Sequence, residues 1–247
     1  MGLIPSGIEN GFNKLLMPLV YTVKTFHISP NMLSTIGIIP SIVAAFLLAY
    51  GWFVAAGVFI LLGGVIDMID GKLARLTNRT SKFGALYDST LDRIAEIAMY
   101  TGIGYFFVYQ DMHFTSLLVV IAASGSIMVS YVRARAESHG YSCNVGWMRR
   151  GERIVLLGGA ALLSFYPQPF DALVIGILKI LPFDLTYYYP PMPLTMAIAI
   201  VAFFTPITVA QRVYVVWKQT KTEKIVSANK QKMESESINT SLEKEKV

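Results

Sequence analysis

Long apolar runs, separated by short polar or aromatic breaks, dominate the pattern of hydrophobic and polar positions in this chain. Six of these runs are long enough to cross a bilayer as helices. They cover about residues 32–50, 53–75, 84–108, 115–137, 150–169 and 191–216. Tyr50-Gly51-Trp52 predicts a tight turn between the first two. The pattern therefore predicts an all-α integral membrane protein with six transmembrane helices.

A different periodicity precedes the first run. Apolar residues recur there at helical spacing, whereas Lys14 and Lys24 lie elsewhere on the helical wheel. The apolar positions are Ile8, Phe12, Leu15, Leu16, Leu19, Val23 and Phe26. This favours an amphipathic helix within residues 1–28 that lies on the cytoplasmic membrane surface, with a simply packed helix as the alternative.

The remaining boundaries follow from local signals. Ser29-Pro30-Asn31 is typical of a helix start, and it opens a six-span catalytic membrane domain that we expect over residues 29–218. Residues 219–247 mix Lys and Glu with little apolar periodicity, which predicts a disordered tail.

Composition and charge support this topology. The 247 residues are 54% hydrophobic and only 15% charged, well below the roughly 25% of soluble domains. Of 21 basic residues, only Lys179 lies on the side of the expected membrane opposite to the others. The positive-inside rule then predicts a multi-pass protein of the cell membrane with both termini cytoplasmic. The aromatic cluster Tyr187-Tyr188-Tyr189 fits an interfacial belt, and we expect no nucleic-acid partner.

Four aspartates interrupt the second and third runs: Asp67, Asp70, Asp88 and Asp92. Each costs about 2.5–3.5 kcal/mol at a bilayer centre, so the four need a compensating cation. Their i,i+3 and i,i+4 spacings place each pair on one helix face. A short loop at about 76–83 makes the two helices antiparallel neighbours, with the pairs at matching depths on the cytoplasmic side. Four hard carboxylates suit two Mg²⁺ or Mn²⁺ ions, which bind phosphate groups, and so indicate chemistry on a diphosphate.

The residues around the aspartates carry a family resemblance. The run Asp67-x-x-Asp70-Gly71-x-x-Ala74-Arg75, eight residues, then Gly84-x-x-x-Asp88-x-x-x-Asp92 resembles the complete signature of the CDP-alcohol phosphotransferase family. The resemblance implies a six-span, usually dimeric enzyme that transfers a phosphatidyl group from a CDP-linked lipid to an alcohol and releases CMP. It assigns metal binding to Asp67, Asp70, Asp88 and Asp92, with Asp92 also the base for the acceptor hydroxyl. It assigns the CDP moiety to Asn31, Ser34, Gly71, Ala74, Arg75 and Ser81.

Basic residues at the cytoplasmic helix ends bear on the acceptor alcohol. Arg153 and Arg212 are flanked by apolar turns and are expected to line a pocket, whereas positive-inside anchoring fully explains Arg149 and Arg150. This supports an anionic acceptor.

The chain also contains Ser89-Thr90-Leu91-Asp92-Arg93 and a Ser130-to-Glu137 segment with two arginines. With these, residues 29–216 resemble the phosphatidylinositol-phosphate synthases of actinobacteria and their archaeal counterparts. In that subfamily the acceptor is a soluble inositol phosphate, and the resemblance implicates Ser130, Arg133, Arg153 and Arg212 in binding its phosphate. Arg133 stands where the subfamily often has Lys, which changes the geometry of the charge. The nearest alternative is a phosphatidylglycerophosphate synthase that uses glycerol 3-phosphate. A divalent-cation transporter is a remote alternative, and the confinement of all four carboxylates to one side of the membrane argues against it.

Overall fold

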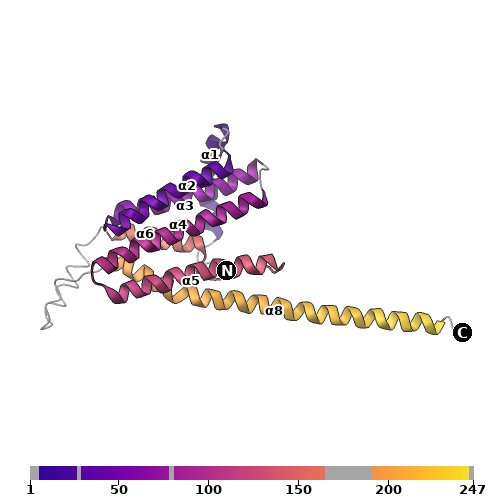
Figure 1. Ribbon diagram of the computed structural model, residues 1–247. Coiled ribbons are helices and arrows are strands. Elements are labelled where there is room, and N and C mark those ends of the chain that lie inside the picture. Colours follow the sequence, from indigo (N-terminus) through magenta and orange to yellow (C-terminus); the bar gives the residue numbers. More distant parts are fainter. Residues whose placement is uncertain (1–5, 27–28, 78–80, 165–190, 245–247) are drawn as a thin grey trace.

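The computed structural model describes residues 6–26, 29–77, 81–164 and 191–244, and its regular secondary structure in this part of the chain is all α-helix (Figure 1). Its helices are α1 (Ser6–Thr25), α2 (Pro30–Ala49), α3 (Phe53–Leu76), α4 (Lys82–Tyr109), α5 (His113–Ser138), α6 (Arg150–Leu163) and α8 (Met192–Lys244). The predicted all-α class is therefore confirmed.

Four of the described helices are long and apolar enough to cross a membrane. They are Pro30–Ala49, Phe53–Leu76, His113–Ser138 and the Met192–Glu223 part of α8. The 28-residue α4 carries several charged side chains within its length, and the described α6 has 14 residues. The count of six spans stays a prediction. The expected end of the fifth run at residue 169, Lys179 and Tyr187–Tyr189 lie outside the described residues.

Six helices close into a ring, in which α2 packs on α3 and α4, α5 on α4 and α8, and α6 on α3 and α8. Buried apolar side chains fill its centre, among them Leu48, Ile103, Phe107, Leu157 and Ile198. Each of these six helices therefore packs against two others of the ring, and the outer face not covered by α1 is left for lipid.

The position of α2 changes one expectation from the sequence. We expected the helices that carry the aspartates to be direct neighbours, but α3 and α4 do not form one of the main helix contacts in the described part of the ring. Instead α2 packs against both of them. Close contact between α3 and α4 would press two pairs of carboxylates together, whereas an intervening helix leaves room for a cavity.

Serine caps fix the start of two helices that carry residues predicted for the site, α2 and α4. The Ser29 hydroxyl accepts a hydrogen bond from the Met32 amide at 3.3 Å, and Pro30 occupies the first turn of α2. The Ser81 hydroxyl accepts one from the Gly84 amide at 2.9 Å at the start of α4. Both caps lie within two turns of the site described below.

The N-terminal helix α1 packs outside the ring, against α3. Leu16 and Val20 are buried there with Ile69 and Leu73. Leu19 and Phe26, which we placed on the same apolar face, are exposed. The contact orients α1 beside the helix that carries Asp67 and Asp70, and its location on the membrane surface stays a prediction.

The last helix continues well beyond the ring (Figure 1). Where we expected a disordered tail from residue 219, the structure extends α8 to Lys244. The Lys- and Glu-rich sequence has good helix propensity and contains no Pro or Gly to stop the helix. The first part of this extension also holds the loop before α6, because Gln219 bonds both backbone groups of Ser142, at 2.7 and 3.2 Å. The Tyr141 hydroxyl adds a hydrogen bond of 2.9 Å to Glu223.

Close approach of α2 and α4 depends on Gly102. A Cβ at this position would lie 2.1 Å from the Ala45 carbonyl oxygen, so Gly102→Ala must push the helices apart. We expect a loss of about 1–3 kcal/mol in the free energy of unfolding and a lower Tm in detergent. Gly104→Ala is the matched control, because its Cβ would meet only Val119 at 3.6 Å. Equal melting temperatures for the two variants would contradict this packing.

Candidate active site

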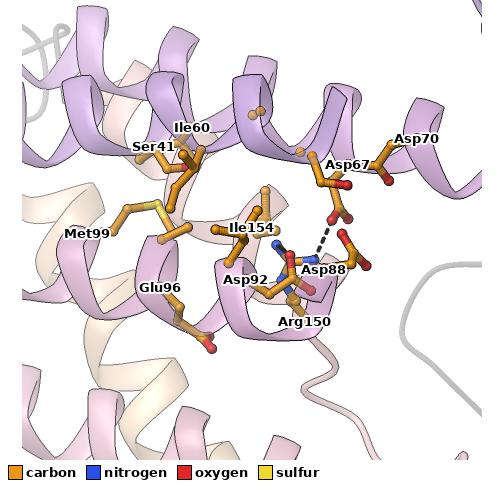
Figure 2. Close-up of a pocket in the computed structure, with 17 residues that line it drawn as sticks. Ser41, Ile60, Asp67, Asp70, Asp88, Asp92, Glu96, Met99, Arg150 and Ile154 are labelled. Atoms are coloured by element: carbon orange, nitrogen blue, oxygen red, sulfur yellow. Dashed lines mark hydrogen bonds and ion pairs between the residues drawn. The ribbon is translucent and has the colours of Figure 1, made fainter. Parts of the chain in front are cut away.

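A cavity opens among α2, α3, α4 and α6, and all four signature aspartates line it (Figure 2). It holds about 540 Å³ of empty space, its open mouth included. The other polar residues of its wall are Ser34, Ser41, Glu96 and Arg150, and the apolar ones include Ile38, Ile60, Met99 and Ile154. The cavity is therefore acidic on one side and apolar on the other.

Three of the aspartates form a compact group of oxygen ligands. Asp67, Asp70 and Asp88 each offer an oxygen, and these atoms all lie within 4.8 Å of one another. A divalent ion with oxygen ligands at about 2.0–2.6 Å fits among atoms at this separation. The Ser34 hydroxyl of α2 lies beside Asp70 and Asp88. The predicted metal-binding aspartates are thus brought together from two helices, and the residues present fit a divalent cation.

The fourth aspartate, Asp92, contacts an arginine. Arg150 Nη2 lies 2.5 Å from Asp92 Oδ1, and Arg150 Nη1 donates to Asp67 Oδ1 at 2.9 Å. Figure 2 shows Arg150 reaching from α6 toward both aspartates. The interpretation of Arg150 as a membrane anchor is therefore wrong. Its guanidinium supplies one of the positive charges that the aspartates require.

The residues predicted for CDP binding lie mainly at the ends of α2, α3 and α4. A Cβ on Gly84 would lie 3.0 Å from the Ser81 hydroxyl and 3.1 Å from the Asn31 side-chain oxygen, so the absent side chain lets these polar groups meet. Ser34 lines the cavity itself. On α3, the exposed Arg75 turns back and donates from Nε to the Gly71 carbonyl at 3.0 Å. Ala74, between them, is partly buried.

Two of the residues predicted to bind the acceptor phosphate bond to α4. Arg153 is 1% exposed, and its Nε and Nη2 lie 2.8 and 2.6 Å from Glu96 Oε1. Its Nη1 donates to the Met148 carbonyl at 2.9 Å. Ser130 accepts a hydrogen bond of 2.7 Å from Arg93. Both contacts hold neighbouring helices to the turn of α4 that follows Asp92.

The other two lie farther toward α8 and the surface. Arg212 is buried and donates to the backbone carbonyls of Val145 and Val129, which ties α8 to α5 and to the loop before α6. Arg133 is half exposed and pairs with Glu137, one turn along α5, at 2.8 Å. None of the four predicted acceptor residues belongs to the described wall of the aspartate cavity.

Two cavity residues, Glu96 and Arg150, were missed in the sequence. Glu96 has a signal there, because it continues the i,i+4 series of Asp88 and Asp92 on the same face of α4. Arg150 has none, since it is one of three arginines within five residues and only the packing of α6 on α3 brings it to Asp67. Arg150 is therefore placed by long-range packing, whereas Glu96 extends the spacing of the signature.

Comparison with known proteins places this site in a family. The model of the CDP-alcohol phosphatidyltransferase family matches residues 27–216. A protein of Aquifex aeolicus is 33% identical over 178 residues, which are 72% of this chain and 91% of that protein. The archaetidylinositol phosphate synthase of Pyrococcus horikoshii is 35% identical over a part that covers 63% of this chain and 77% of the relative.

Solved structures share the fold. The phosphatidylinositol phosphate synthase of Mycobacterium tuberculosis with CDP-DAG bound matches with a TM-score of 0.68 at 24% identity, over 83% of this chain and 94% of that one. The same enzyme in complex with manganese and citrate matches with a TM-score of 0.66 at 25% identity, over 81% and 88% of the two chains. The matched region contains the whole aspartate cavity, and this chain belongs to the CDP-alcohol phosphatidyltransferase family of enzymes.

Proposed function

We propose that this enzyme transfers the phosphatidyl group of CDP-diacylglycerol, or of an archaeal CDP-lipid, to inositol phosphate and releases CMP. The reaction class is supported by one observation. Asp67, Asp70 and Asp88 cluster in one cavity, which Asp92 also lines. The inositol phosphate acceptor rests on the relatives, which include an archaetidylinositol phosphate synthase of Pyrococcus horikoshii and a phosphatidylinositol phosphate synthase of Mycobacterium bovis.

Asp67, Asp70 and Asp88 would hold the divalent cation, and Asp92 completes the set if two ions bind. Once bound, Mg²⁺ or Mn²⁺ neutralises the diphosphate and the charge that develops on the CMP leaving group. We propose two ions in this site, either Mg²⁺ or Mn²⁺.

Asp92 is the proposed general base. It accepts the proton of the acceptor hydroxyl while that oxygen forms a bond to the lipid-side phosphorus and the P–O bond to CMP breaks. Its position one turn deeper than Asp88 on α4 keeps it beside the cation-binding group, within the same cavity. The contact with Arg150 fixes the orientation of its carboxylate before the acceptor arrives.

The cellular setting follows the resemblance and the charge pattern. We propose a homodimer in the cell membrane, with six spans and with the termini and the cavity on the cytoplasmic side. Soluble inositol phosphate would enter from that side, and the CDP-lipid from the bilayer. Basic residues flank both termini and the ends of the helices at the aspartate level, which supports this orientation.

Removal of one carboxylate should weaken metal binding. Asp88→Asn should lower the Mn²⁺ affinity of the purified protein by more than about tenfold. Loss of a residue that only contacts a metal ligand already lowers metal affinity by about tenfold, and loss of a ligand should lower it further. Titration calorimetry or Mn²⁺ resonance measures this without turnover. Asp111→Asn is the matched control, because Asp111 lies beyond the far end of α4, where an Asn also tolerates its φ of 54°. Equal affinities of the two variants would contradict the metal assignment.

Removal of the base should stop the chemistry but spare the fold. Asp92→Asn keeps the shape of the side chain, and we expect kcat for CMP release to fall by about 10²–10⁴-fold. The thermal unfolding curve should stay close to that of the unmodified chain. A purified variant that releases CMP at the original rate would exclude Asp92 as the base.

The acceptor is tested with radiolabelled CDP-diacylglycerol, Mg²⁺ and a panel of alcohols. We expect the highest kcat/KM with inositol phosphate, and lower values with glycerol 3-phosphate, free inositol and serine. A preference for glycerol 3-phosphate would instead identify a phosphatidylglycerophosphate synthase.

If Arg153 binds the phosphate, Arg153→Ala raises KM for phosphorylated acceptors only. An equal rise for unphosphorylated acceptors would remove Arg153 from that role.

A further inference from the structure

The segment that connects α5 to α6, residues 139–149, contains no helix or strand and lies along α8. The residues of α8 that bond to it are Thr208, Arg212, Gln219 and Glu223. Their spacings of four, seven and four residues place them within about 60° of one another around the helix. One stripe of α8 therefore runs beside the connecting segment.

The end of this segment next to α6 is bonded to α8 inside the ring. The Met148 amide donates to the Thr208 hydroxyl at 3.2 Å, and the Met148 carbonyl accepts a hydrogen bond from Arg153 of α6 at 2.9 Å. Gly146 passes so close to α8 that a Cβ there would overlap the Thr208 side chain. The backbone of Met148 thus connects α8 directly to α6.

The other end of the segment is bonded to the part of α8 that continues beyond the ring (Figure 1). The Gln219 side chain donates to the Ser142 carbonyl at 2.7 Å and accepts from the Ser142 amide at 3.2 Å. The Tyr141 hydroxyl donates to Glu223 at 2.9 Å. Gln219 and Glu223 both follow residue 216, where the match to the family model ends. These bonds therefore come from residues outside the family match.

We infer that Gln219 is a positioning residue for Asp92, and that it acts through the connecting segment and Arg150. The inference rests on the proposed function, in which Asp92 is the general base. The segment ends at Arg149, and Arg150 is the first residue of α6. Arg150 Nη2 lies 2.5 Å from Asp92 Oδ1, so a shift of the segment moves the guanidinium against the base.

The backbone of the segment explains why it needs this contact. Gly140 follows the end of α5 at a φ of 82°, in a region where glycine leaves the chain several directions to take. Ser142 comes two residues later, and the Gln219 side chain bonds both of its backbone groups. Paired bonds to one residue fix its orientation as well as its position. Gln219 thereby selects one path for the segment toward α6.

The consequence is expected in the chemical step rather than in binding of the CDP-lipid. The base must lie within hydrogen-bond reach of the acceptor hydroxyl, and a misplacement of about 1 Å can lower a rate by about 100-fold. The residues predicted for the metal and for CDP belong to α2, α3 and α4 or to the cap of α4, which the segment does not connect. Loss of the Gln219 contact should therefore lower kcat and leave KM for the lipid nearly unchanged.

The experiment compares Gln219→Met with Thr222→Ala in the purified full-length chain. Methionine keeps the length of the side chain and removes both hydrogen bonds, whereas the Thr222 hydroxyl bonds to the Lys218 carbonyl of its own helix at 3.1 Å. We expect Gln219→Met to lower kcat for CMP release at least about fivefold, as for the loss of one hydrogen bond of average strength. KM for CDP-diacylglycerol should stay within about twofold, and Thr222→Ala should change neither constant by more than that. A lower Tm with an unchanged kcat would show that Gln219 only stabilises the fold, and would overturn the inference.

A double variant tests whether the effect passes through Arg150. Arg150→Gln removes the guanidinium that contacts Asp92. In that background Gln219→Met should lower kcat by less than about twofold, because the contact it positions is already gone. The same loss as in the unmodified chain would show that Gln219 acts independently of Arg150, and would overturn the inference. If Gln219→Met does not fold, Gln219→Glu decides, because it loses the donor to the Ser142 carbonyl, and an unchanged kcat in that variant overturns it.

Failure of the proposed function is distinguishable from failure of this inference. The variants are compared with the alcohol that gives the fastest CMP release by the unmodified enzyme, so a wrong acceptor leaves the comparison intact. If Asp92→Asn releases CMP at the original rate, the base assignment and this inference are both wrong. If Asp92→Asn is inactive and Gln219→Met keeps the original kcat, the proposed function stands and only the role of Gln219 is wrong.

Discussion

Mutual repulsion among four buried or partly buried carboxylates is the constraint on which the rest of this structure depends. Two helices carry the aspartates in pairs, and a direct α3–α4 interface would place the pairs face to face in a medium of low dielectric. The fold inserts α2 between them and brings α6 to the open side. The resulting cavity keeps Asp67, Asp70 and Asp88 near enough to share a cation and separate enough to admit a ligand.

The same constraint explains the partners of the charged residues in α4. Asp88, Asp92, Arg93 and Glu96 fall within three turns of it, at a depth where isolated charges are costly. Each has a partner on another helix or one turn along its own. Arg93 contacts Ser130 and lies 3.7 Å from Glu96, which in turn pairs with Arg153. The helix therefore gains polar packing from α5 and α6 in place of the apolar contacts that a simple membrane span would make.

The sequence was sufficient for the features that depend on local spacing. Helix periodicity located the helices within a few residues, the i,i+3 and i,i+4 pairs identified the carboxylates, and Ser29-Pro30 marked the start of α2. It failed where partners come from distant segments. The order of helices around the ring, with α2 between α3 and α4, and the contact of Arg150 with Asp67 across 83 residues both follow from tertiary packing. The continuation of α8 was missed because charged, helix-forming residues give no apolar periodicity.

The arginines of this protein differ more in their burial and their partners than their neighbouring positions in the chain suggest. Arg153 and Arg212 are buried, and their N–H groups bond to a carboxylate or to backbone carbonyls. Moving Arg153 toward a ligand would leave the buried Glu96 without a partner, and moving Arg212 would leave buried backbone carbonyls without one. Each unpaired group would cost about 1–3 kcal/mol. Arg150 keeps 24% of its side chain exposed and lies in the wall of the cavity, in contact with Asp67 and Asp92. Of these three arginines, it alone belongs to the described wall of the cavity.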